Sequence, residues 1–120
     1  GCYLIVGGDF NTKKRSKVTS SAMSDILVTS GPYPVDQDGN GDTNQNRDHP
    51  YDWLIANRAL DKLEIPLEIG NSKYPNGLVF DSRVYTPLSE VDPIEPSDSG
   101  TSSMQHMPVV RAFSIPVIED

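Results

Sequence analysis

The chain has 120 residues, 36% of them hydrophobic, and a formal net charge of −7 at pH 7. This length gives room for one domain with a modest core. The acidic balance argues against a module that coats nucleic acid by charge alone, because such domains are strongly basic. The single cysteine, Cys2, excludes an internal disulfide and a zinc site built from several cysteines. No apolar run approaches the ~18 residues of a transmembrane helix.

The first half of the sequence predicts two strands separated by a short helix and a long loop. Residues 3–6 are an apolar run, which predicts a buried strand ending at Gly7 and Gly8. The spacing of apolar residues within 20–29 predicts the helix. Residues 31–50 have turn chemistry and no hydrophobic periodicity, so an irregular loop is expected there. A second buried strand is expected over residues 51–56.

The second half predicts further strands around a second irregular stretch. Residues 63–69 alternate in polarity, with Pro66 favouring a sheet edge, and further strands are expected over 78–85 and 109–117. Residues 87–104 are rich in Pro, Ser and acidic residues and predict a loop. This order indicates an α+β fold, a mostly antiparallel β-sheet with one or two short helices. One or two short helices cannot cover both faces of the sheet. The chain is therefore expected to be a fragment of a longer domain.

Polar residues lie at the ends of three predicted strands, and each has a structural as well as a chemical interpretation. After the first strand, Asp9 could bind a divalent cation or activate water, and Asn11 could donate to a phosphoryl oxygen. The same two residues could instead form an Asx turn. Asp52 starts the second strand and is either a surface residue or the partner of an imidazole. His106 precedes the last strand, where it could be structural or catalytic.

The order of these segments resembles the C-terminal half of the endonuclease/exonuclease/phosphatase superfamily. The matching elements are Gly-Asp-Phe-Asn at 8–11, Tyr-Asp-Trp-Leu-Ile at 51–55, and Ser-x-Gln-His-x-Pro-Val at 103–109. The superfamily comprises metal-dependent phosphoesterases, including nucleases and other phosphodiesterases. The resemblance implies that residues 1–120 form half of a four-layer α/β-sandwich. The partner would be the missing N-terminal half of the same domain.

The resemblance also implies a role for each matching residue. Asp9 would orient or deprotonate the attacking water, and Asn11 would hold the scissile phosphate. Asp52 would pair with His106, which would contact the phosphate ester, with Mg²⁺ or Mn²⁺ as cofactor. Asp9 and Gln105 are the candidate metal ligands, although Gln105 stands where the superfamily usually has aspartate. The main metal-binding glutamate would lie outside this chain, so the isolated chain is expected to be inactive or nearly so. The substrate stays open among DNA, RNA, inositol phosphates and lipid head groups.

An acidic cluster in the predicted loop over 31–50 has two competing interpretations. Asp36, Asp38, Asn40 and Asp42 fit the first half of a calcium loop, but Arg47 stands at the position of its bidentate glutamate. The segment is therefore either a weak Ca²⁺ site or a flexible acidic loop.

The basic residues Lys13, Lys14 and Arg15 follow Asp9 closely and could bind a phosphate or a nucleic-acid backbone, or form an ordinary solvated turn.

The alternative functions are a non-catalytic Ca²⁺-binding or interaction domain on a β scaffold, and a degenerate superfamily member that has lost activity.

Overall fold

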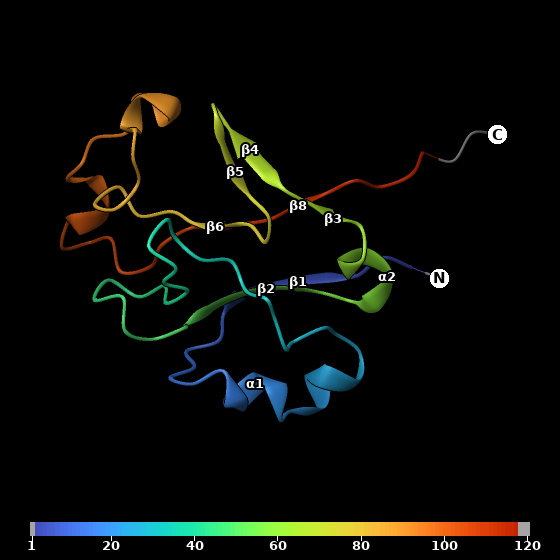
Figure 1. Ribbon diagram of the computed structural model, residues 1–120. Coiled ribbons are helices and arrows are strands. Elements are labelled where there is room, and N and C mark those ends of the chain that lie inside the picture. The colour runs from blue at the N-terminus through green and yellow to red at the C-terminus, as the bar shows by residue number, and fades with distance from the viewer. Residues whose placement is uncertain (1, 118–120) are drawn as a thin grey trace.

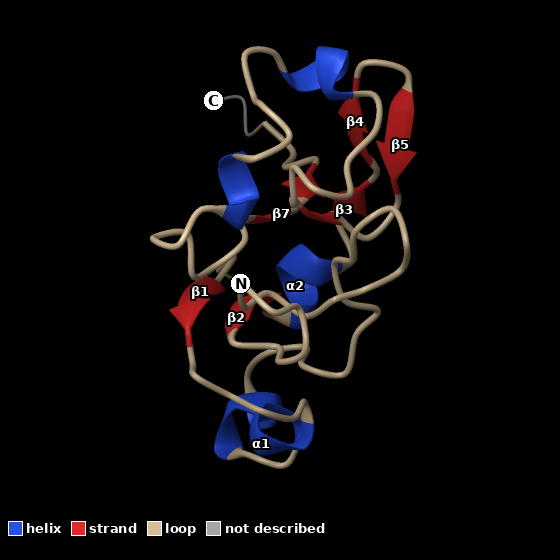
Figure 2. Ribbon diagram, turned by 90° about the vertical axis from the view of Figure 1, so that its left-hand side faces the viewer, coloured by secondary structure: helices blue, strands red, loops and turns tan. Residues whose placement is uncertain are grey.

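The computed structural model describes residues 2–117 and confirms the predicted α+β fold. Short strands pair in antiparallel fashion, and loops and turns make up much of the path (Figures 1 and 2). The helical elements are α1 (Ser16–Thr19), α2 (Arg58–Asp61) and the 3₁₀ turns η1 (Ala22–Asp25), η2 (Leu88–Val91) and η3 (Asp98–Gly100). Within the described residues, no helix is long and apolar enough to cross a membrane.

The longest strands, β1 (Ile5–Asp9) and β2 (Asp52–Ala56), pair antiparallel in the centre of the molecule (Figure 1). The prediction that the first strand ends at the two glycines is wrong, because both glycines lie inside β1. Gly7 faces Leu54 across the pair, and a Cβ atom built on Gly7 would lie 3.0 Å from the Leu54 Cδ1 atom. Glycine therefore allows the two strands to pair with Leu54 lying over β1.

The predicted helix over 20–29 is also wrong in its position. Helix α1 ends at Thr19, η1 follows as a separate turn, and the chain is extended by Leu27, which forms a β-bridge with Asn57. The serine hydroxyls explain the break, because Ser21 donates to the Val18 carbonyl and Ser24 to the Ser21 carbonyl. Such side-chain bonds to the local backbone compete with a continuous helix.

The later strands are shorter than the sequence predicts. They are β3 (Glu64–Ile65), β4 (Leu67–Ile69), β5 (Ser72–Tyr74), β6 (Leu78–Val79), β7 (Val109–Val110) and β8 (Ala112–Phe113). Pro66 separates β3 from β4, since proline has no N–H to donate. The strand predicted over 78–85 stops at Val79, and a turn follows in which Val84 N–H and Tyr85 N–H donate to the Asp81 carbonyl.

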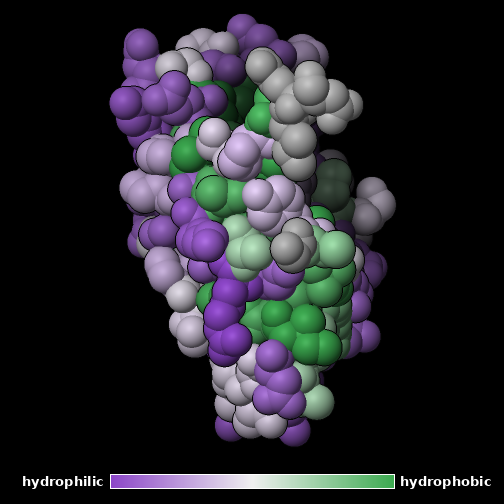
Figure 3. Space-filling view, turned by 90° about the vertical axis from the view of Figure 1, so that its right-hand side faces the viewer, coloured by the Kyte–Doolittle hydropathy of each residue, from purple (hydrophilic) through white to green (hydrophobic). Residues whose placement is uncertain are grey.

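A hydrophobic cluster of the core packs against one face of the β1–β2 pair. Trp53 and Ile55 of β2 pack there against Val18 of α1 and Leu27. The molecule is correspondingly flat, with extents of 44 × 36 × 21 Å. Ile5 of β1 is exposed, as are the two residues before it, Tyr3 and Leu4. Figure 3 shows apolar side chains gathered on the side of the molecule from which the N-terminus emerges.

Candidate active site

Two carboxylates meet at one end of the central strand pair. Asp9 is the last residue of β1 and Asp52 the first of β2, and the two are directly opposite each other in the antiparallel register. Like charges at opposed positions of a strand pair are destabilising unless a cation or a proton compensates them. The end of the β1–β2 pair is therefore a place where a positive group is favoured.

That group is the imidazole of His106. Its Nδ1 lies 2.9 Å from Asp52 Oδ2, within hydrogen-bond distance, and its Nε2 lies 3.6 Å from Asp9 Oδ2. The hydrogen bond to Asp52 raises the pKa of His106 above its ordinary value; burial opposes this, while the negative charges of Asp52 and Asp9 add to it. The ring therefore lies between two carboxylates, one at each nitrogen. Of the two interpretations of Asp52, the partner of an imidazole is the one that this geometry favours.

The position of His106 predicts its titration. We expect NMR of the His106 ring protons to give a pKa above 6.5, and Asp52→Asn to lower that pKa towards 6.5. Because the folded-state pKa is raised, the pair stabilises the fold fully below pH 6.5 and loses this contribution as the pH rises through the folded-state pKa. An unchanged His106 pKa in Asp52→Asn would contradict the hydrogen bond as its cause.

A cleft of about 280 Å³ opens beside the two carboxylates. It is lined by Gly7, Gly8, Asp9, Asp52, Trp53, Leu54, Met107 and Val109. Asn11 is exposed just beyond β1, and its backbone N–H donates to Asp9 Oδ1 at 2.8 Å, so the Asx-turn interpretation is confirmed for these two residues. Gln105 is exposed beside His106. The structure thus brings Asp9, Asp52 and His106 together and ties Asn11 to Asp9 through the backbone.

The same three residues could hold a metal ion. One donor atom from each of Asp9, Asp52 and His106 lies within 4.8 Å of the other two. Carboxylate oxygens suit Mg²⁺ or Mn²⁺, and imidazole is also a ligand for several transition metals. This donor set fits a divalent cation in charge and spacing.

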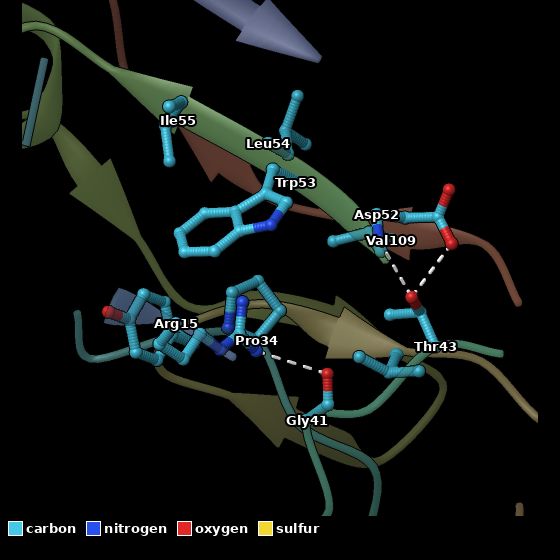
Figure 4. A pocket seen from close by; sticks show the side chains of 11 residues that line it. Arg15, Pro34, Gly41, Thr43, Asp52, Trp53, Leu54, Ile55 and Val109 are labelled. Atoms are coloured by element: carbon cyan, nitrogen blue, oxygen red, sulfur yellow. Dashed lines mark hydrogen bonds between the residues drawn. The ribbon is translucent and has the colours of Figure 1, made fainter. Parts of the chain in front are cut away.

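Of the three basic residues, Lys13 and Lys14 are exposed and Arg15 is half-buried. The two lysines lie close to Asp9 in the sequence. Arg15, a candidate either for phosphate binding or for an ordinary solvated turn, packs its guanidinium against the rings of Tyr33 and Trp53, 3.9 and 4.7 Å from their centroids. The same guanidinium donates to the carbonyl of Gly41 (Figure 4). These contacts make Arg15 a structural residue and leave the two lysines as exposed cations.

The calcium-like loop closes around an arginine. The Arg47 guanidinium donates to the carbonyls of Asn40 and Asp42 and forms ion pairs with Asp36 and Asp81, both at 2.9 Å. The other oxygen of Asp36 accepts the N–H of Asn40 and also that of Asp38. A cationic side chain of the loop itself thus meets the carboxylate of Asp36 and the backbone carbonyls of Asn40 and Asp42, three of the four residues in the calcium-like pattern.

Sequence analysis missed one residue that contacts the site. Thr43 is fully buried in the loop, and its hydroxyl lies 2.7 Å from Asp52 Oδ2 (Figure 4). A threonine nine positions before Asp52, within a stretch without periodicity, offers no signal that would distinguish it from its polar neighbours.

Comparisons with protein-family models, with curated proteins and with solved structures found no match for this chain.

Proposed function

We propose that this chain belongs to a metal-dependent phosphoesterase, a nuclease or another phosphodiesterase, and that Asp9, Asn11, Asp52 and His106 are its catalytic residues. The observation that carries the proposal is the His106 ring between two carboxylates, bonded to Asp52 at 2.9 Å and facing Asp9 at 3.6 Å. An imidazole whose pKa is raised by its neighbours stays protonated at higher pH, so it can donate a proton or a hydrogen bond to a phosphate oxygen.

Each side chain then has a step in ester hydrolysis by water. Asp52 holds Nδ1 of His106, which leaves Nε2 to donate to the phosphate or to the leaving oxygen. Asp9 accepts a proton from the attacking water or orients it. Asn11 offers its side-chain amide to a phosphate oxygen, and the exposed Lys13 and Lys14 add positive charge near it. Bound at Asp9 and its neighbours, Mg²⁺ or Mn²⁺ would neutralise charge on the phosphate.

We further propose that the chain is the C-terminal half of a four-layer domain, covered by an N-terminal half of the same protein. The support is the uncovered apolar side of the β1–β2 region: Tyr3, Leu4 and Ile5 are exposed, and the cleft beside Asp9 has Leu54 and Val109 in its walls. Large apolar side chains gathered on one surface mark a place where another layer packs. On this proposal the isolated 120 residues have at most trace activity.

The test is hydrolysis of a chromogenic phosphodiester and of plasmid DNA by the full-length protein that contains this chain, with Mg²⁺ or Mn²⁺ and with EDTA. We expect metal-dependent turnover, and His106→Ala should reduce it by about 10²–10³-fold, the loss typical of removing a group that stabilises transition-state charge.

The matched control is His49→Ala, which removes the other histidine and leaves Asp9, Asp52 and His106 in place. It should retain activity near the level of the native protein. Absence of turnover on either substrate with either metal, or equal losses in the two histidine variants, would overturn the proposal.

A further inference from the structure

Thr43 connects the long loop to the candidate active site through its side chain. The residue has no exposed surface, and its Oγ1 is 2.7 Å from Asp52 Oδ2 and 2.9 Å from the Asp52 backbone nitrogen. Because Oγ1 accepts the backbone N–H, its own proton is free to donate to the carboxylate. Figure 4 shows both bonds and the Thr43 side chain pointing at Asp52 from the loop.

The backbone of Thr43 reaches the other member of the pair. Its carbonyl accepts the N–H of Met107 at 2.7 Å, directly after His106, and the next loop residue, Asn44, forms a β-bridge with His106 itself. The carboxylate oxygen that accepts the Thr43 hydroxyl also accepts His106 Nδ1, at 2.9 Å. Thr43 therefore contacts Asp52 with its side chain and the His106 segment with its backbone.

We propose that Thr43 is a positioning residue for the Asp52–His106 pair, holding the carboxylate so that one of its oxygens receives Nδ1–H and the His106 ring presents Nε2 to Asp9. An aspartate carboxylate rotates easily about its last side-chain torsion. The backbone of β2 does not restrict this rotation, but a hydrogen bond from a fixed hydroxyl does. The effect of Thr43 on catalysis rests on the proposed function. Its hydrogen bonds to Asp52, and their effect on the position of the carboxylate, do not depend on any reaction.

The test compares three variants by ¹⁵N NMR of the histidine rings, at a pH where His106 is neutral, which reports which ring nitrogen carries the proton. Thr43→Val keeps the shape and removes the hydroxyl, and Thr43→Ser restores it. The matched control is Thr12→Val, since Thr12 is another buried threonine whose hydroxyl bonds to Trp53 Nε1 at 2.8 Å and not to Asp52.

We expect the proton on Nδ1 of His106 in the native protein, in Thr43→Ser and in Thr12→Val, and a mixture of the two tautomers in Thr43→Val. In the full-length protein, Thr43→Val should lower kcat by about 10-fold with KM little changed, the scale of losing a group that orients a ligating or catalytic side chain.

An Nδ1–H tautomer that persists unchanged in Thr43→Val would overturn the inference and leave Thr43 a packing residue. If Thr43→Val does not fold, NMR of the Thr43 hydroxyl proton in the native protein provides the test instead. A Thr43 hydroxyl proton protected from exchange, with a nuclear Overhauser effect to His106 Nδ1–H, supports the role, and a rapidly exchanging hydroxyl contradicts it. The two claims can fail separately. If Thr43→Val changes the tautomer but the full-length protein has no phosphoesterase activity, the positioning role stands and the proposed function is overturned.

Discussion

Arg47→Met is expected to lower the free energy of unfolding by about 3–5 kcal/mol, the cost of removing one partner from a buried ion pair. The Arg47 side chain is only 10% exposed, and the carboxylates of Asp36 and Asp81 that it pairs with are 4% and 1% exposed. Methionine fills a similar volume but leaves the carbonyls of Asn40 and Asp42 without their donor. Urea unfolding followed by circular dichroism would measure the loss.

The control for this prediction is Lys73→Met, which removes an exposed ion pair of the same kind. Lys73 and Glu68 lie 3.3 Å apart with side chains 71% and 63% exposed, so its removal should cost no more than about 1 kcal/mol. Equal effects of the two substitutions would contradict the structural role of Arg47.

Calcium distinguishes this interpretation from the sequence pattern. If Arg47 is the cation that the loop oxygens bind, any effect of Ca²⁺ on the melting temperature is the same in the native protein and in Asp38→Asn, which removes an exposed loop carboxylate. A rise in melting temperature with Ca²⁺ that Asp38→Asn abolishes would show that the loop binds the ion as well.

Asp81, one of the carboxylates around Arg47, also gives the network a pH dependence. Burial alone would raise the pKa of Asp81, but the hydrogen bonds from Arg83 and Arg47 outweigh it and hold that pKa below its usual value. Asp81 therefore stabilises the fold above the unfolded-state pKa of 3.8, and this contribution is lost as the pH falls through the lower folded-state value.

The parts of the fold that sequence could predict are those with a continuous apolar signal. The run around Trp53 predicted β2 almost to the residue, because a buried strand needs apolar side chains on both faces. The helix failed for a local reason, since Ser21 and Ser24 bond to nearby carbonyls and the apolar spacing within 20–29 does not report such competition. The strand after Leu78 was predicted too long because the turn at Asp81 is made by polar bonds, which periodicity does not detect.

The candidate site divides in the same way. Asp9, Asp52 and His106 could be predicted as candidates because each lies next to a recognisable apolar run. The β1–β2 register brings Asp9 and Asp52 together, and the bridge between His106 and the loop residue Asn44 brings the imidazole to them. Thr43 could not, because its position depends on how a loop without periodicity folds back onto β2. Arg15 was assigned from its charge alone, and charge does not reveal that Tyr33 and Trp53 enclose the guanidinium. Polar residues close to a recognisable apolar run were thus predictable, even where, as at His106, a loop contact places them. Thr43 has no such run beside it.

On the proposed phosphoesterase function, Asp9→Asn is expected to reduce turnover of a phosphodiester by the full-length protein by about 10²–10⁴-fold, the range for loss of a general base. The substitution preserves shape, and the asparagine oxygen can still accept the Asn11 N–H that bonds to Asp9 Oδ1 at 2.8 Å. It removes the negative charge 3.6 Å from His106 Nε2, and with it both a proton acceptor for water and a ligand for a divalent cation.

The matched control is Asp48→Asn, because Asp48 faces the other histidine, His49, at 3.9 Å and is 59% exposed. Steady-state rates at several Mn²⁺ concentrations separate the two roles of Asp9. If saturating Mn²⁺ restores activity, Asp9 acts mainly as a metal ligand, and a deficit that persists at saturation assigns it to the attacking water. Comparable activity of Asp9→Asn and Asp48→Asn at every metal concentration would remove Asp9 from the proposed catalytic residues, because loss of its carboxylate would then cost no more than loss of an exposed one.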